Sequence, residues 1–314
     1  MTSAPAIEAL GLAKRFGRIT ALDDFTLSVG RGEAFGFLGP NGAGKTTAVK
    51  LLLGLCRPTS GAAEVLGAPL GDREARRAVG YLPELFRYQD WLCPREVLIF
   101  HARLAGISRS SRTAQIDEAL EGVGLAARAN DRVGTFSKGM QQRLGLAVAL
   151  VGRPALVFLD EPTSALDPLG RRDVRAIVER LRARGTAVFL NSHLLTEVER
   201  VCDRVAFVDR GRVVAQGTIA DILGAARAVR FRLESPDEIA LAILGRYGSV
   251  DAKPPWFTLR GIGEADVPRL IAELAGAGAS VHAVEPTRTT LEERFLELLR
   301  AGHADLDDRH TNPM

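Results

Sequence analysis

The chain has 314 residues, of which 46% are hydrophobic and 25% charged, a composition that excludes a disordered or fibrous protein. Chains of this length usually divide into more than one hydrophobic core, so two domains are expected. The formal net charge is +3, and arginines alternate with acidic residues instead of forming a stripe of one sign. The sequence therefore predicts no nucleic-acid partner.

The cysteines and the hydrophobic segments indicate the compartment. Cys56, Cys93 and Cys202 are odd in number, widely spaced and free of any CxxC pattern, which argues against a disulfide framework and against a zinc site. A reducing compartment is expected. The N-terminus lacks the apolar stretch of a signal peptide, and the longest apolar run, residues 144–152, is too short for a bilayer. We expect that the chain does not cross a membrane by itself.

The first motif is GPNGAGKTT, which follows a short apolar strand at residues 33–38 and precedes a helical pattern that stops near Gly54. Its glycines let successive backbone N–H groups point inward, and the helix dipole adds positive charge, so the loop forms a nest for phosphate. Lys45 can reach the outer phosphates, and the Thr46 hydroxyl can bind Mg²⁺. The predicted nucleotide-binding residues are Gly39, Pro40, Asn41, Gly42, Ala43, Gly44, Lys45, Thr46 and Thr47.

Two later apolar strands end in residues with catalytic chemistry. The strand at 155–160 ends in Asp160, followed by Glu161 and a proline, and a buried parallel strand delivers such carboxylates to the ligand-binding edge of the sheet. Asp160 is expected to hold Mg²⁺ and Glu161 to polarise the attacking water. The strand at 188–193 ends in His193, which would touch a γ-phosphate there, although a purely structural histidine is the alternative.

Between these motifs lies FSKGMQQR, residues 136–143, followed by an apolar stretch that predicts a buried helix. Ser137 is placed to cap this helix and Gly139 keeps the turn open, so the helix start would face an anion. The chain already has one phosphate site. A second anion-binding helix start makes sense if it completes the site of another copy.

These residues together resemble one family, the ATPase subunits of ATP-binding cassette (ABC) transporters. GPNGAGKTT resembles its Walker A motif, LVFLDEP its Walker B with the catalytic glutamate, FSKGMQQR its signature, SALD its D-loop and NSH its switch histidine, in order across roughly residues 6 to 220. The resemblance implies an α/β P-loop ATPase fold, the ABC nucleotide-binding domain, with an inserted helical subdomain at about 86–150.

The resemblance also assigns roles to residues. It implies ATP and Mg²⁺ as cofactors, Glu161 and His193 as catalytic residues, and Phe16 as the aromatic that stacks on adenine. Ser137, Lys138, Gly139 and Met140 would act on the other subunit's ATP, Ser164 and Asp167 would form the D-loop, and Thr46, Glu84 and Asp160 would hold the metal.

The chain departs from the common family pattern at Glu84, where a glutamine is usual, and at Lys138 and Met140 in the signature. Glu84 can still ligate Mg²⁺, but it loses an amide donor and adds negative charge. Both variants resemble a bacterial branch related to drug, antibiotic and lipid exporters. The expected function is therefore an ATP-hydrolysing subunit that drives transport, with export favoured.

The resemblance implies partners as well. We expect a homodimer with a second ABC subunit, a separate membrane-spanning permease, and a peripheral location on the cytoplasmic face of the cell membrane. The large apolar residues of the segment Leu85–Leu92 offer a groove for the permease, with internal packing of the helical subdomain as the equal alternative. The alternative is a soluble ABC-type ATPase that acts on nucleic acid or the ribosome. Against it, no long heptad coiled coil lies between Lys45 and Asp160, and the chain carries a single cassette. A GTPase or small-molecule kinase would not explain FSKGMQQR.

The last third of the chain predicts a small α+β domain at residues 229–302, after an ABC domain at 1–222 and a linker at 223–228. The order of its elements resembles a split β-α-β sandwich. A closing helix carries Leu291, Phe295, Leu298 and Leu299 on one face, and residues 303–314 are expected to be a disordered tail. Strands are predicted at 229–234, 249–253, 256–260 and 280–285, and helices at 236–246 and 264–276.

Overall fold

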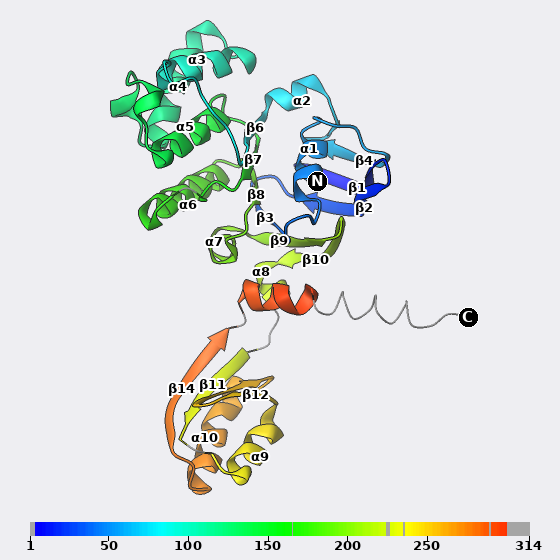
Figure 1. Cartoon of the computed structure of the whole chain (residues 1–314), viewed down its shortest axis with the longest axis vertical. Helices are drawn as coiled ribbons and strands as arrows, with labels where there is room; N and C mark the ends of the chain where they lie inside the picture. Colours follow the sequence, from blue (N-terminus) through cyan, green and yellow to red (C-terminus); the bar gives the residue numbers. More distant parts are fainter. Residues whose placement is uncertain (1–3, 165, 224–226, 235, 289, 300–314) are drawn as a thin grey trace, which may run out of the picture. The chain divides into compact units, whose positions relative to one another are not determined.

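The computed structural model describes residues 4–164, 166–223, 227–234, 236–288 and 290–299. Residues 224–226 of the predicted linker, and the predicted tail at 303–314, lie outside the described residues, whereas residue 223 ends α8 and residues 227–228 begin β11. The chain divides between Ile219 and Ala220 into two compact units (Figure 1).

A six-stranded sheet forms the centre of the first unit, in the order β10-β9-β3-β8-β7-β6. The strands from β9 to β6 run parallel, and β10 pairs antiparallel with β9 at one edge. Every residue of β3, β7 and β8 is buried, as expected for parallel strands that are covered on both faces. The bounds are β3 Ala34–Leu38, β6 Val79–Leu82, β7 Leu156–Asp160, β8 Ala187–Asn191, β9 Arg204–Asp209 and β10 Arg212–Thr218.

A second, antiparallel sheet in the order β2-β1-β4-β5 shares a hydrophobic core with helix α1 and with the central strands. Phe189 of β8 lies at the middle of this core, with ring centroids 5.0, 5.1 and 5.9 Å from those of Phe37, Phe158 and Phe35. These rings pack the three strands that lead to the site. The bounds are β1 Ile7–Phe16, β2 Ile19–Val29, β4 Ser60–Val65, β5 Ala68–Pro69 and α1 Lys45–Leu52.

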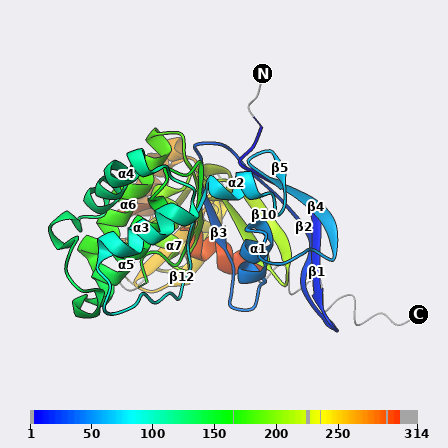
Figure 2. The same ribbon diagram turned by 90° about the horizontal axis from the view of Figure 1, so that it is seen from above.

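Helices α3, α4 and α5 are inserted between β6 and β7 and form a helical subdomain of the first unit. Seen from above, they lie on one side of the sheet together with α6 and α7, while α1 and the antiparallel sheet lie on the other (Figure 2). The bounds are α2 Arg73–Arg77, α3 Pro94–Leu104, α4 Arg109–Gly122, α5 Lys138–Leu150, α6 Pro168–Ala183, α7 Leu195–Val201 and α8 Ile219–Leu223.

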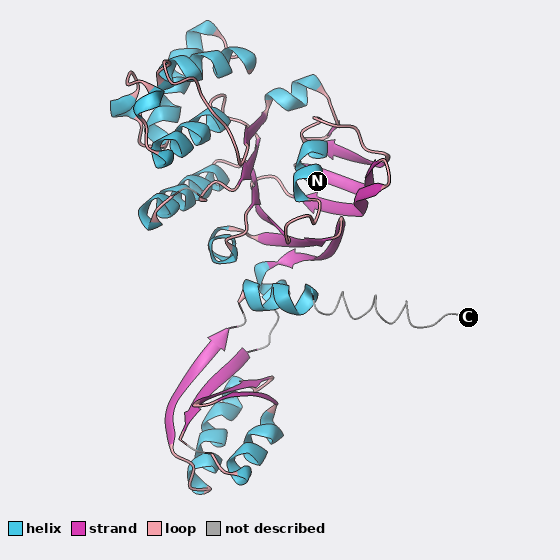
Figure 3. Cartoon of the chain, viewed as in Figure 1, coloured by secondary structure: helices cyan, strands magenta, loops and turns pink. Residues whose placement is uncertain are grey.

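The second unit is a β-α-β-β-α-β arrangement with helices packed against an antiparallel sheet of order β12-β13-β11-β14 (Figure 3). Its predicted strands and helices are confirmed within a few residues. The second helix begins at Val267 rather than 264, because residues 264–266 form a 3₁₀ turn and a proline follows at the helix start. The bounds are β11 Arg227–Leu233, α9 Glu238–Tyr247, β12 Ser249–Lys253, β13 Trp256–Arg260, α10 Val267–Gly276 and β14 Val281–Arg288.

The closing helix spans residues 291–299. Leu291 is fully buried, whereas Phe295, Leu298 and Leu299 are half-buried. Across the part of the chain that the structure describes, no helix combines the length and apolar character required to cross a membrane.

Candidate active site

The carboxyl ends of four neighbouring parallel strands, β3, β8, β7 and β6, carry the predicted catalytic and binding residues. Lys45 follows β3, and His193 follows β8. Asp160 ends β7 and Glu161 follows it, while Glu84 follows β6. In an open α/β sheet this edge is where ligands bind. Segments more than a hundred residues apart in the sequence thus meet at one place.

The loop between β3 and α1 depends on glycine at two points of close approach. Gly44 has a φ of 98°, and a Cβ there would lie 2.4 Å from the carbonyl oxygen of Ala21. A Cβ on Gly39 would lie 2.3 Å from the carbonyl oxygen of Val208. No side chain caps α1, whose N-cap is Gly44, so the first N–H groups of this helix remain available to an anion.

Lys45 folds back over this loop. Its Nζ donates hydrogen bonds to the carbonyl oxygens of Gly39 and Pro40 at 2.6 and 3.1 Å. Burial lowers the pKa of Lys45, an effect that the nearby carboxylates of Glu161, Asp160 and, more weakly, Glu84 oppose. The two carbonyl partners are neutral, so a phosphate would offer the ammonium group stronger, charge-assisted hydrogen bonds.

Asp160 is buried at the end of β7, where its Oδ1 accepts a 2.6 Å hydrogen bond from Asn191 Nδ2. Burial raises the pKa of Asp160, and the hydrogen bond from Asn191 opposes this shift. Among the described residues, no three His, Cys, Asp or Glu side chains gather to hold a metal ion. Mg²⁺ commonly takes one or two protein oxygens and completes its shell with water and phosphate oxygens. The oxygen donors of Thr46 and Asp160 fit an ion of this kind.

Glu161 and His193 lie together at the mouth of the site. Glu161 is 8% exposed and has a φ of 51°, in the left-handed region. Its Oε1 accepts a 2.9 Å hydrogen bond from the backbone N–H of His193, and His193 Nδ1 lies 2.8 Å from Oε2. Oε2 is buried and has no hydrogen-bond partner among the described residues, so its 2.8 Å approach to the imidazole is a close contact without hydrogen-bond alignment. The His193 segment therefore holds the carboxylate through Oε1.

The predicted signature lies at the start of α5, in the helical subdomain that is inserted between β6 and β7 (Figure 1). Ser137 Oγ accepts a 3.2 Å hydrogen bond from the backbone N–H of Met140, so the predicted helix cap is confirmed. Ser137 and Lys138 are exposed, and Gly139 and Met140 are half-buried. This helix start thus faces outward from the molecule that carries it.

The two predicted D-loop residues have partners within the chain. Ser164 Oγ donates to the carbonyl oxygen of Glu161 at 3.1 Å, and Asp167 Oδ1 accepts from the backbone N–H of Gly170 at 2.8 Å as the N-cap of α6. The structure therefore gives both residues a role in shaping the turn after Glu161.

Phe16 and Glu84 are placed at the periphery. Phe16 ends β1 with 52% of its surface exposed, and Lys14 Nζ lies 4.8 Å from its ring centroid. Such an exposed aromatic ring presents a flat face to a stacking partner. Glu84 is exposed and contributes negative potential at both Lys45 and Asp160.

The sequence analysis missed two residues of the site, Gln142 and Asn191. Gln142 Nε2 donates to the carbonyl oxygens of Pro162 and Glu161 at 3.1 and 3.5 Å, and Asn191 supports Asp160 from the next strand. The available signal was an amide side chain beside a run of apolar residues in each case, before LGLAVAL in α5 and after AVFL in β8, because a buried amide requires hydrogen-bond partners.

The glycine loop before α1, its lysine and the acidic end of β7 define a P-loop nucleotide-binding protein. Residues 22–164 match the model of the ABC transporter family. The chain is 39% identical over 287 residues to an ABC transporter ATP-binding protein of Synechocystis sp., covering 90% of this chain and 79% of that protein. It is also 34% identical over 316 residues to the daunorubicin/doxorubicin resistance ATP-binding protein of Streptomyces peucetius, covering 98% and 95%.

A solved structure of an ATP-binding subunit of an ABC transporter superimposes with a TM-score of 0.65 at 33% identity, covering 69% of this chain and 91% of the other. The chain belongs to the family of ABC transporter ATP-binding proteins. The resemblance stated from its motifs and the expected cassette fold are thereby confirmed.

Proposed function

We propose that the chain is the ATP-hydrolysing subunit of an ABC exporter and that two identical copies enclose two ATP molecules. The observation that carries this proposal is the division of anion-binding features between two faces. The glycine loop with Lys45 lies at the sheet edge, and the Ser137-capped helix start opens outward from the helical subdomain. Neither face alone surrounds a triphosphate, so the site is complete only when a second copy supplies the missing half.

In this proposal the loop residues Gly39, Pro40, Asn41, Gly42, Ala43, Gly44, Lys45, Thr46 and Thr47 bind the phosphates of one ATP, and Phe16 stacks on its adenine. The partner's copies of Ser137, Lys138, Gly139 and Met140 contact the γ-phosphate from the other side. Ser164 and Asp167 lie at the turn that would border both sites.

The hydrolytic step relies on the residues at the strand ends. Glu161, whose Oε1 is held by the His193 backbone N–H, orients a water molecule for in-line attack on the γ-phosphate. Lys45 stabilises the charge that develops on the phosphate oxygens, and His193, 62% exposed at the side chain, contacts the γ-phosphate itself. Mg²⁺, held by Thr46, Glu84 and Asp160, would supply further positive charge.

The membrane partner is proposed from an exposed apolar surface of the helical subdomain. Leu85 is 87% exposed, Trp91 71%, and Phe100 and Leu104 of α3 are also exposed. By contrast Phe86 and Tyr88, from the same predicted contact segment, pack against each other with ring centroids 5.5 Å apart. We propose that the exposed residues bind a separate membrane-spanning chain, which places the protein peripherally on the cytoplasmic face of the cell membrane.

Export is supported by the drug-resistance ATP-binding protein from Streptomyces peucetius, of which this chain covers 95%. Lys138 and Met140 in the signature, together with Glu84, also favour export, because they resemble the exporter branch of the family. An ATPase that acts on nucleic acid or the ribosome is not favoured by these relatives.

The experiment replaces Glu161 by Gln and measures mass in solution with and without ATP. We expect turnover to fall by at least about 100-fold and an ATP-dependent dimer to accumulate, because the substitution removes the negative charge that polarises water. Glu179→Gln, an exposed change on α6, is the control and should behave as the native protein. If Glu161→Gln stays monomeric at saturating ATP while the native protein hydrolyses ATP, the two-copy mechanism is wrong. A stoichiometry of one active site per assembled complex would refute identical copies.

A further inference from the structure

Gln142 is a buried polar residue of helix α5. It is 5% exposed and lies in α5 next to the buried residues Leu144, Gly145 and Leu146. Burying an amide without hydrogen bonds is unfavourable, so its side chain must find partners in another element. Those partners are in the turn that follows β7, about twenty residues further along the chain.

The partners of Gln142 are the backbone carbonyls on either side of the Glu161–Pro162 peptide bond. Nε2 lies 3.1 Å from the carbonyl oxygen of Pro162 and 3.5 Å from that of Glu161. The backbone N–H of Glu161 donates to the carbonyl oxygen of Asn191 at 2.9 Å, and Ser164 Oγ also donates to the Glu161 carbonyl. Three elements thus hold the backbone of this one residue.

Glu161 needs that support because its φ of 51° is unusual for a residue with a side chain. A backbone in this conformation persists only where the surroundings fix it. The same conformation brings the carboxylate to the His193 backbone N–H. Loss of a donor to the Glu161 and Pro162 carbonyls would therefore let the carboxylate leave its position.

We propose that Gln142 is a positioning residue for Glu161 and connects the signature helix of a subunit to the catalytic carboxylate of the same subunit. This inference rests on the proposed function, and it provides a physical connection between the two ATP sites of the dimer. The first turn of α5 contacts the partner's nucleotide, and Gln142, five residues after the Ser137 cap, holds the turn that carries Glu161. A shift of α5 when it engages one ATP changes the hydrogen bonds that orient the glutamate at the other.

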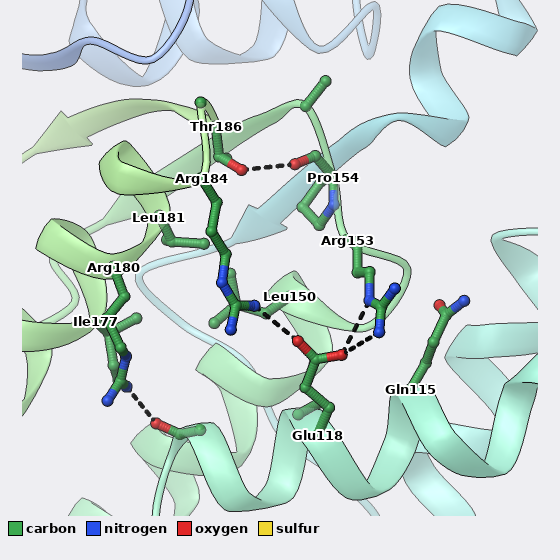
Figure 4. A pocket seen from close by; sticks show the side chains of 14 residues that line it. Gln115, Glu118, Leu150, Arg153, Pro154, Ile177, Arg180, Leu181, Arg184 and Thr186 are labelled. Atoms are coloured by element: carbon green, nitrogen blue, oxygen red, sulfur yellow. Dashed lines mark hydrogen bonds and ion pairs between the residues drawn. The ribbon is translucent and has the colours of Figure 1, made fainter.

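A separate group of contacts joins α4 to the end of α6 and to the loop before β7. Glu118 of α4 pairs with Arg153 and Arg184 at 2.6 and 2.7 Å, and Arg180 donates to the carbonyl oxygen of Gly122 at 2.8 Å (Figure 4). They line a cavity of about 400 Å³ that includes the residues just before β7 and β8, at the amino ends of these strands. Water competes for these exposed ion pairs, whereas the Gln142 contact is buried.

The first test is Gln142→Met, which keeps the length of the side chain and removes the amide donor. We expect kcat for ATP hydrolysis to fall at least about tenfold while KM and ATP affinity change less than twofold, since the phosphate loop is untouched. Gln115→Met makes the same chemical change on α4, at a partly buried glutamine whose Oε1 has no hydrogen-bond partner among the described residues. It should keep native turnover. Native kcat in Gln142→Met would overturn the inference.

The second test combines Gln142→Met with Glu161→Gln and measures residual hydrolysis in single-turnover experiments. If Gln142 acts through the carboxylate, the added substitution causes no further loss, whereas losses that multiply show a general structural role and overturn the proposal. The single Glu161→Gln variant separates the two ideas. Full turnover in that variant removes the proposed function, and lost turnover there with native activity in Gln142→Met removes only this inference.

Since a buried substitution can prevent folding, Gln142→Glu provides a further variant. Burial against carbonyl oxygens raises the pKa of such a carboxyl group, and only its protonated form donates a hydrogen bond. The turnover of Gln142→Glu relative to the native protein should rise as the pH falls from 8 to 6. A ratio that stays near one across this range overturns the proposal.

Discussion

A largely buried salt bridge between α6 and α7 allows a quantitative prediction of stability. Arg175 of α6 donates to both carboxylate oxygens of Glu197 of α7, at 2.9 and 2.6 Å, and the side chains are only 22% and 12% exposed. Helix α7 begins at Leu195, two residues after His193, so this pair secures the segment that presents the histidine. Arg175→Met removes both hydrogen bonds and leaves Glu197 charged and largely buried.

The expected cost follows from this geometry. Breaking a fully buried pair costs about 3–5 kcal/mol, and the remaining exposure here reduces the expectation to about 2–3 kcal/mol. For a unit of this size, such a loss lowers Tm by about 5–10 °C. Urea unfolding and thermal melting measure both quantities. Arg172→Met, an exposed neighbour on the same helix, should change stability by less than about 0.5 kcal/mol.

A double-mutant cycle identifies the cause of the loss. Arg175→Met combined with Glu197→Gln removes the unpaired charge, so the double variant should be more stable than Arg175→Met alone. If the double variant loses the sum of the two single losses, the pair does not interact as the structure describes, and the reasoning is refuted.

Two other changes have defined outcomes. Hydrogen bonds from Arg153 and Arg184 hold the pKa of Glu118 below its usual 4.5, and partial burial opposes this shift. The stabilisation is therefore full above pH 4.5 and is lost as the pH falls through the lowered pKa. Glu118→Gln should lower the free energy of unfolding by at most about 1 kcal/mol, because water screens these ion pairs. Urea titrations should show a difference from the native protein that is constant from pH 8 to 5 and shrinks below pH 4.5. A difference that grows on acidification contradicts this pairing. Lys45→Ala should weaken ATP binding by about 10- to 100-fold in calorimetry, since charge-assisted hydrogen bonds to phosphate are lost. Lys50→Ala, on the exposed side of α1, is its control, and equal affinities for the two variants would refute the role of Lys45.

The local features of the chain were predictable because they depend on neighbouring residues. A short apolar strand, a glycine-rich turn and a helical pattern lie within about twenty residues of one another, so backbone preferences alone place Lys45 at a helix start. The cap of α5 by Ser137 is equally local. In the second unit, alternating strands and apolar helix faces predicted the order of elements for the same reason.

The arrangement of the site required the tertiary structure. Strand β8 lies between β3 and β7, and only this order brings His193 against Glu161. The hydrogen bonds of Gln142 to the turn after β7 join two segments whose contact no spacing in the sequence indicates. Polar pairing in a core depends on which elements pack together.

The sequence by itself determined the local features of this protein: a glycine-rich loop before a helix, an acidic strand end and a helix start capped by Ser137, each a property of a few consecutive residues. The tertiary structure alone decided how these groups act on one another. Lys45, Glu161 and His193 become neighbours through strand order, and the left-handed backbone of Glu161 is held by donors from α5 and from the turn that follows it. Such placement arises from long-range packing, which acts between residues far apart in the chain.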